Sequence, residues 1–498
     1  MKATITIDPY RTIGTINPNI YGQFLCRRKE VADGGLYNPE HPDADENGLR
    51  KKVVDYIAQS APPIIRWPGG CTAMTFDWRE SVGPIEQRSR TFDTHFRCDV
   101  TNGFGTVEFI EFCRRIGAEP HLNFNTGTGT LRDALEWVEY CNYDGDSKYA
   151  NLRRAHGYEE PFNVRYWQLG NEEYNKGEIG HKTPEEYAVF AREWAKTLKK
   201  YDPDLKLLAV GGMAHFCVEW DLAVLEKAWR HIDYITAHRY WNFNSAKGEE
   251  NYDSIAAVGY IEEQNMKALI GLIDYMAAKK ETLNRPQIAY TEWNVRDTSQ
   301  AKMIKDKGSL GRTKYRVVDA LAVAGFINAM QRQCQRVTLS SFAQSINVVG
   351  MLYVNNEHVV RETLYWALKM QRHLSAPIAI NSYVDCDGYS TTLKHQPMEN
   401  VPFIDVSATL DEDNKRLVLS LINRHRAEEI TTRVNLKDTK PKANAKLHRL
   451  WHEDPLAMNT IDNPDTVVPE ESTITNAGTD FEIALLPHSY SVIELHLG

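Results

Sequence analysis

Two glutamates stand at the ends of two apolar, β-prone runs that are far apart in the chain. Residues 164–169 lead into Gly170-Asn171-Glu172, and residues 287–291 lead into Glu292-Trp293-Asn294. Two carboxyl groups at strand ends can cleave a glycosidic bond, because one donates a proton while the other attacks or stabilises charge. Only the fold can bring Glu172 and Glu292 together. The pair therefore favours a sugar-cleaving barrel.

Eight strand-like runs alternate with helical patterns between about residues 20 and 380. One helix is expected over 184–200, with Thr183 as its N-cap and Pro184 at its first position. Such alternation predicts parallel strands joined by right-handed crossovers, and eight units suit a (β/α)₈ TIM barrel. A doubly wound open sheet is the alternative. The eight runs are 20–25, 63–67, 119–125, 164–169, 205–210, 234–238, 288–292 and 337–342.

Beyond about residue 385, short strands follow one another without helices, which indicates an all-β sandwich of jelly-roll type. Residues 3–8 also alternate like a strand and have no helix after them, so we expect this strand to join the C-terminal sheet. The predicted domains are therefore a catalytic barrel over 19–384 and a β-sandwich domain made of 1–18 and 385–498.

The composition excludes several classes of protein. The 498 residues carry a net charge of −9 without a basic tract, which argues against nucleic acid and against an anionic membrane surface as partners. No run approaches the ~18 apolar residues of a membrane helix, and the first residues lack a signal-peptide core. The eight cysteines are scattered, so we expect reduced thiols in a cytoplasmic protein.

The predicted strand ends are rich in amides, carboxylates and aromatic rings, which suit a polyhydroxylated ligand. No HxH, HExxH or clustered Cys/His spacing occurs, so neither a metal nor a cofactor is expected. Simpler explanations exist for single residues: an Asn-Glu pair can cap a helix, His238 can be a core histidine, and Cys71 a small buried residue. Arg66 in a buried run is costly unless a carboxylate pairs with it, which favours a role in the site.

Five segments together resemble glycoside hydrolase family 51, the α-L-arabinofuranosidases, and occur in that family's order. The resemblance covers nearly the whole chain and implies a (β/α)₈ barrel with a C-terminal β-sandwich that includes the N-terminal strand. It implies no cofactor, and it implies a homo-oligomer, often a hexamer. The segments are Ile20-Tyr21-Gly22-Gln23-Phe24, Arg66-Trp67-Pro68-Gly69-Gly70, Gly170-Asn171-Glu172, Glu292-Trp293-Asn294 and Ala343-Gln344-Ser345-Ile346-Asn347-Val348.

The resemblance also implies roles for individual residues. Glu172 matches the acid/base and Glu292 the nucleophile of a retaining mechanism. The residues that match positions lining the sugar site are Arg66, Cys71, Asn171, His238, Tyr240 and Gln344, to which we add Cys26 and Trp293. Cys26 is a departure, because the family usually has a glutamate there that hydrogen-bonds the terminal furanose.

The resemblance implies release of terminal α-L-arabinofuranosyl residues from oligo- or polysaccharides. Cys26 leaves open the same chemistry on another glycone or linkage, such as a β-xyloside, a galactofuranoside or an internal β-glucan bond. A non-catalytic sugar-binding protein on the barrel scaffold is a further alternative, which the two intact glutamates disfavour.

Overall fold

The computed structural model describes residues 1–212, 217–245, 252–298, 313–393 and 396–498. Eight strands close a barrel in chain order, and every neighbouring pair is parallel. The predicted TIM barrel is confirmed. Its strands are β2 (Gly22–Phe24), β3 (Ile64–Trp67), β6 (Glu119–Asn123), β7 (Tyr166–Leu169), β8 (Lys206–Ala209), β9 (Tyr234–Phe243), β10 (Gln287–Asp297) and β11 (Val337–Ala343).

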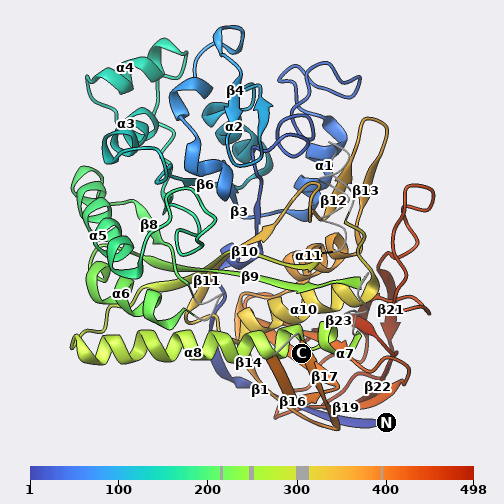
Figure 1. The fold of residues 1–498 in the computed structure, drawn as a ribbon. Coiled ribbons are helices and arrows are strands. Elements are labelled where there is room, and N and C mark those ends of the chain that lie inside the picture. Colours follow the sequence, from blue (N-terminus) through green and yellow to red (C-terminus); the bar gives the residue numbers. More distant parts are fainter. Residues whose placement is uncertain (213–216, 246–251, 299–312, 394–395) are drawn as a thin grey trace.

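Helices surround the barrel (Figure 1). The predicted helix over 184–200 begins as expected, because Thr183 and Glu186 cap it reciprocally and Pro184 occupies its first turn. The helices are α1 (Lys51–Ser60), α2 (Thr106–Ile116), α3 (Leu131–Asn142), α4 (Lys148–Ala155), α5 (Pro184–Tyr201), α6 (Val218–Ala228), α7 (Tyr252–Ala256), α8 (Val258–Lys279), α10 (Val317–Arg332) and α11 (Thr363–Leu374).

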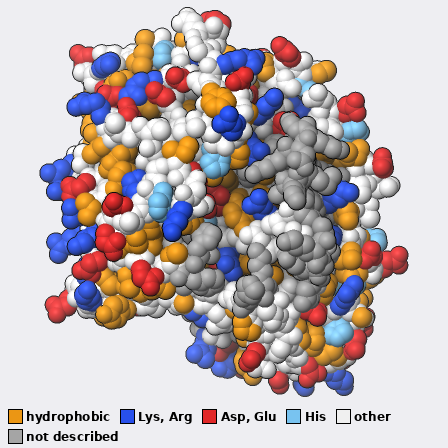
Figure 2. Space-filling view, in the orientation of Figure 1, with side chains coloured by type: hydrophobic (Ala, Val, Ile, Leu, Met, Phe, Trp, Pro, Cys, Tyr) orange, Lys and Arg blue, Asp and Glu red, His pale blue; other side chains and the backbone are white. Residues whose placement is uncertain are grey.

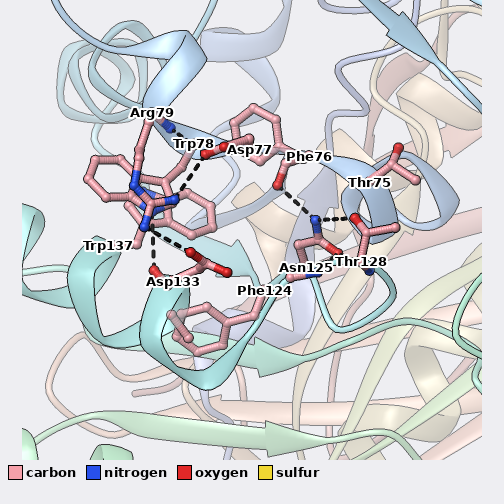
Figure 3. Close-up of a pocket in the computed structure, with 12 residues that line it drawn as sticks. Thr75, Phe76, Asp77, Trp78, Arg79, Phe124, Asn125, Thr128, Asp133 and Trp137 are labelled. Atoms are coloured by element: carbon pink, nitrogen blue, oxygen red, sulfur yellow. Dashed lines mark hydrogen bonds and ion pairs between the residues drawn. The ribbon is translucent and has the colours of Figure 1, made fainter.

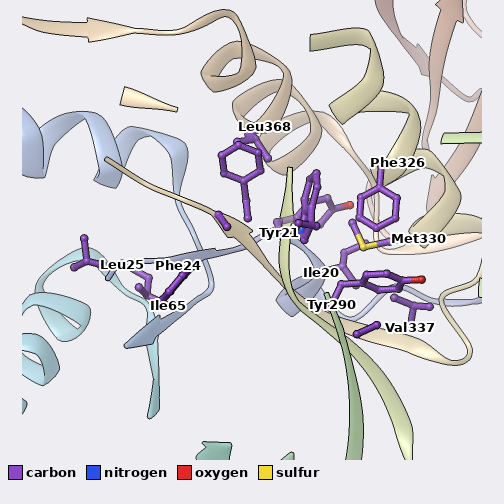
Figure 4. Packing of buried hydrophobic residues seen from close by; sticks show 14 of the residues in the cluster. Ile20, Tyr21, Phe24, Leu25, Ile65, Tyr290, Phe326, Met330, Val337 and Leu368 are labelled. Atoms are coloured by element: carbon purple, nitrogen blue, oxygen red, sulfur yellow. The ribbon is translucent and has the colours of Figure 1, made fainter. Parts of the chain in front are cut away.

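The barrel strands bury both faces. Inside, Ile64, Leu208, Tyr234, Ala289 and Leu339 form one apolar layer from five strands. Outside, rings from the strands pack on the helices, as Figure 4 shows for Tyr290 beside Phe326 and Met330 of α10. Two-sided burial explains why these strands read as continuous apolar runs rather than alternating ones.

A nine-stranded sheet forms the second layer of the molecule, in the order β21-β20-β23-β18-β17-β14-β1-β19-β22. As predicted, the N-terminal strand lies within it, antiparallel to β14 and parallel to β19. Strands from both halves of the sheet share one apolar core, so the sheet curls over on itself. The strands are β1 (Lys2–Thr15), β14 (Ile378–Cys386), β17 (Ile404–Asp411), β18 (Arg416–Asn423), β19 (Ile430–Leu436), β20 (Ala445–Leu450), β21 (Glu470–Ile474), β22 (Asp480–Leu485) and β23 (Ser489–His496).

Strand β14 crosses the predicted division at 384/385, because the chain enters it soon after α11 ends at Leu374. Three two-stranded ribbons complete the fold: β4 (Thr91–Asp93) with β5 (Cys98–Val100), β12 (Leu352–Val354) with β13 (Val359–Arg361), and β15 (Gly388–Leu393) with β16 (Gln396–Pro402). Short 3₁₀ helices include η2 (Cys71–Thr75) directly after β3.

The surface mixes charges of both signs, as Figure 2 shows for one face. Within the described residues, no helix combines the length and the apolar character that crossing a bilayer requires.

Candidate active site

Glu292 points into the barrel because β10 carries a bulge. The pairing of β10 with β9 shifts between Tyr290 and Glu292, so Thr291 is an extra residue in the strand. A bulge lets two consecutive side chains face the same side. Thr291 accordingly contacts His238 inside the barrel, and Glu292 follows it on the same side. The predicted end of this strand at Glu292 is wrong, because β10 continues to Asp297 beside an equally extended β9.

Glu172 lies just beyond β7, in a tight turn. Gly170 has φ +97°, and a Cβ there would lie 1.8 Å from a carboxyl oxygen of Glu173, so only glycine fits. Glu172 itself has φ +52°, an uncommon conformation for a non-glycine residue. The turn places Asn171 and Glu172 at the carboxyl end of the fourth barrel strand.

The two glutamates converge on His238 of β9. One carboxyl oxygen of Glu172, one of Glu292 and one ring nitrogen of His238 all lie within 4.8 Å of one another. His238 Nδ1 is 2.8 Å from Glu172 Oε1 and 4.0 Å from Glu292 Oε2. Both carboxyl groups therefore face one small volume, with side-chain exposures of 16% for Glu172 and 10% for Glu292.

Two donors fix the Glu292 carboxylate. Arg66 Nη1 donates to Oε1 at 2.7 Å, and the Tyr240 hydroxyl donates to Oε2 at 2.8 Å. Burial, with the nearby Glu292 carboxylate, raises the pKa of Tyr240, so its hydroxyl keeps its proton at neutral pH. Arg66 is fully buried, and its Nη2 donates to Asn171 Oδ1 at 2.8 Å. The buried charge of Arg66 is thus paired, as the sequence required.

A cavity of about 930 Å³ opens over the two carboxyl groups. Of the other predicted site residues, five line it: Cys26, Cys71, His238, Tyr240 and Gln344. Arg66 and Asn171 lie behind Glu292 and act through hydrogen bonds, although the side-chain NH₂ of Asn171 has no hydrogen-bond partner among the described residues.

Trp293 does not line the cavity, which corrects its assignment as a substrate-binding residue. Successive side chains of a strand point to opposite faces, so Trp293 faces outward when Glu292 faces inward. It is fully buried between barrel and helix, against Trp241, Phe326 and Phe342.

Other lining residues were not predicted from the sequence. Leu393, Gln396 and Pro397 come from the β15–β16 hairpin, and Arg239 Nη2 of the barrel donates to Gln396 Oε1 at 3.2 Å. His95 and Phe96 come from the turn between β4 and β5. No local pattern marks these residues, because ribbons remote in the chain fold over the mouth of the barrel.

A second, smaller cavity of about 130 Å³ lies between the β3 and β6 loops (Figure 3). Its polar side chains form ion pairs and hydrogen bonds with neighbouring protein groups. Arg79 contacts Asp77 and Asp133, and the Asn125 side-chain NH₂ donates to the Phe76 carbonyl and to Thr128. Donors that are already paired leave little to offer a ligand, so the larger cavity is the candidate active site.

Comparisons with known proteins agree with this geometry. Residues 56–257 match the model "Alpha-L-arabinofuranosidase 1 domain", and residues 291–489 match "Alpha-L-arabinofuranosidase C-terminal domain". A probable alpha-L-arabinofuranosidase C of Aspergillus fumigatus is 37% identical, with 82% of each chain covered. An intracellular exo-alpha-(1->5)-L-arabinofuranosidase 1 of Bacillus subtilis is 29% identical over 99% of each chain. The arabinose-complex structure of a Thermotoga maritima alpha-L-arabinofuranosidase superposes with TM-score 0.89 at 33% identity, over 99% of each chain.

Proposed function

The chain belongs to glycoside hydrolase family 51, the α-L-arabinofuranosidases, and from this membership we propose that it releases terminal α-L-arabinofuranosyl residues from oligo- and polysaccharides with retention of configuration. The observation that carries the proposal is the approach of two carboxyl groups within 4.8 Å in one cavity. Retaining glycosidases hold this pair about 5–5.5 Å apart, whereas inverting enzymes leave a wider gap for water.

Glu292 is the nucleophile in this proposal. Two hydrogen bonds from Arg66 and Tyr240 stabilise its carboxylate and fix its orientation. It attacks the anomeric carbon, the bond to the leaving oxygen breaks, and a covalent glycosyl-enzyme forms. Because Arg66 also holds Asn171, one guanidinium links the nucleophile to the residue directly before Glu172.

Glu172 is the acid and base. It gives its proton to the departing oxygen, then takes a proton from the water that releases the sugar from Glu292. His238 positions it: Nδ1 contacts Glu172 Oε1 at 2.8 Å, and Nε2 contacts the Thr291 hydroxyl at 2.9 Å. With the Thr291 hydroxyl donating to Nε2, the ring N–H at Nδ1 donates to Glu172 Oε1 and fixes the orientation of that carboxyl group.

Removing the Glu172 carboxyl group tests the assignment. Glu172→Ala is expected to lower kcat by orders of magnitude on a poor leaving group and much less on an activated aryl α-L-arabinofuranoside, which needs no acid. Azide should restore turnover of the activated substrate and give an arabinosyl azide of retained configuration by NMR. Near-normal turnover of unactivated substrate by Glu172→Ala would contradict the role.

A panel of aryl glycosides tests which sugar the enzyme prefers. Cys26 buries its thiol against the Thr72 hydroxyl, with Sγ and Oγ1 3.4 Å apart, and it offers no carboxylate to the furanose. Arabinofuranoside should nevertheless give the highest kcat/KM. A higher kcat/KM for a β-xyloside or a galactofuranoside would show that arabinofuranose is the wrong substrate sugar, while the proposed mechanism would stand. Binding of arabinose without any hydrolysis would favour a sugar-binding protein.

We also propose a cytoplasmic location and a homo-oligomer. The structure pairs none of the eight cysteines in a disulfide, as is typical of reducing compartments, and the name of the Bacillus subtilis relative describes it as intracellular. Fractionation of the producing cells tests the location. Light scattering of the purified chain tests the hexamer that the family resemblance implies.

A further inference from the structure

A second cluster of ligand-type side chains borders the active-site cavity. Cys71 opens η2, His95 lies in the turn between β4 and β5, and Glu178 lies in the loop between β7 and α5. One sulfur, one ring nitrogen and one carboxyl oxygen from these residues lie within 4.8 Å of one another. His95 Nδ1 is 3.7 Å from Glu178 Oε1.

These distances approach those of a metal tetrahedron. Zinc binds sulfur at about 2.3 Å and nitrogen or oxygen at about 2.0–2.2 Å, so its ligand atoms lie roughly 3.3–3.8 Å apart. The His95–Glu178 distance already falls in this range. The other two pairs of ligand atoms lie within 4.8 Å.

The donor atoms of the cluster favour a cation. Glu178 has only 1% of its side chain exposed, and within the described residues its one ion-pairing partner is His95. Glu178 thus presents a buried carboxyl oxygen beside a ring nitrogen of His95 and the sulfur of Cys71. Sulfur, nitrogen and oxygen donors in one small volume are a ligand set that suits a borderline-soft divalent ion.

We propose that Cys71, His95 and Glu178 bind a zinc-like divalent cation with a fourth position open to the active-site cavity. Cys71 and His95 line that cavity together with Glu172 and Glu292. The bound ion therefore occupies space beside the sugar site and competes with substrate. The competition rests on the proposed function; the binding of the ion does not.

Cobalt binding tests the site without any measurement of activity. The full-length, metal-free protein is titrated with Co²⁺, and a thiolate-to-cobalt charge-transfer band is followed in the near ultraviolet. We expect one Co²⁺ per chain, displaced by Zn²⁺. His95→Ala, a change in a partly exposed turn, and Cys71→Ala should each weaken binding at least tenfold.

Cys98→Ser provides the matched control, because Cys98 is another free thiol, in β5 close to His95 in the chain, and lies outside the cluster and the cavity lining. It should bind Co²⁺ like the parent. Absence of the band overturns the proposal, and so does a band that survives His95→Ala or is lost in Cys98→Ser. Binding without the band would place the ion at Glu172, His238 and Glu292 instead, which also overturns it.

Inhibition kinetics test whether the bound ion competes with substrate. Zn²⁺ should raise KM for an aryl arabinofuranoside without lowering kcat, at concentrations that match the binding titration. If the protein binds the ion but hydrolyses no glycoside, the proposed function fails and the metal site stands. If Zn²⁺ inhibits His95→Ala and the parent equally, inhibition arises elsewhere and the competition is refuted.

Discussion

At the scale of single residues, the site depends on a few hydrogen bonds that hold one carboxylate. Glu292 receives one donor on each oxygen, from Arg66 and from Tyr240. Arginine supplies charge and spans two acceptors, whereas tyrosine supplies one neutral donor at a fixed angle. The two donors therefore make different contributions, and the tyrosine can be removed without leaving a buried charge unpaired.

Tyr240→Phe is expected to lower kcat roughly 10- to 100-fold, since a hydrogen bond to a charged group contributes about 1.5–3 kcal/mol. Steady-state kinetics on an aryl glycoside measures the loss. Tyr290→Phe is the matched control, because its hydroxyl donates to Glu262 on the outer side of the same sheet. An equal loss of kcat in both variants would show that the hydrogen bond from Tyr240 to Glu292 does not contribute specifically to catalysis.

At the scale of elements, the barrel strands could be predicted in their order along the chain. Strands that are buried on both faces consist of consecutive apolar residues, and such runs are visible in the sequence. Glu172 and Glu292 could be found since each follows such a run. Trp293 was misassigned because it is next to Glu292 in the chain, whereas the alternation of side chains along β10 places it on the opposite, outer face of the strand. The β15–β16 hairpin over the cavity was missed because its contact with Arg239 joins segments far apart in the chain.

The turn after β3 leaves room for the Glu292 carboxylate, because Gly70 in this turn has no side chain. A Cβ on Gly70 would lie 2.5 Å from Glu292 Oε1, closer than atoms can approach. Gly70→Ala should therefore displace the nucleophile and lower kcat by at least tenfold while the protein stays folded. Circular dichroism and kinetics together check this outcome.

Gly271→Ala is the comparison for that variant, because nothing lies within 4 Å of the added methyl group in α8. It should leave kcat unchanged and increase the free energy of unfolding by about 0.5–1 kcal/mol, since alanine is the better helix former. Full activity of Gly70→Ala would contradict the tight placement of Glu292.

At the scale of the whole molecule, a buried charge cluster joins the barrel to the β-domain. Asp405 of β17 lies 3.3 Å from Arg332 Nη2 of α10 and 3.0 Å from Arg424 Nη2, and it accepts a hydrogen bond from Asn328 at 2.8 Å. Burial alone would raise the pKa of Asp405, but Arg332 and Arg424 outweigh it and hold the pKa below 3.8. The two domains thus share an electrostatic contact in which Asp405 and Arg424 are buried and Arg332 is partly exposed.

Asp405→Asn should lower the free energy of unfolding at pH 7 by about 3–5 kcal/mol, because the fully buried Arg424 guanidinium loses its carboxylate, while Arg332 keeps Glu263 as a partner. A lowered pKa stabilises the fold above the unfolded value of 3.8, and this stability is lost as the pH falls below it. The difference from the parent should therefore shrink below about pH 4. Urea unfolding at several pH values measures it.

Asp480→Asn is the matched control, since Asp480 pairs with Arg433 on the surface, where an ion pair adds little. Its urea midpoint should equal that of the parent. If Asp405→Asn behaved the same way, the cluster at the domain boundary would not hold the two parts together.

Labelling of the nucleophile tests the central claim most directly. Glu172→Ala is mixed with an activated aryl α-L-arabinofuranoside without azide, so that the glycosyl-enzyme forms faster than it is hydrolysed. Mass spectrometry of the intact chain and of its peptides should then find one added pentosyl group, attached to the peptide that carries Glu292. A label on any other residue, or a burst of aglycone without a labelled protein, would contradict the pairing of Glu172 with Glu292.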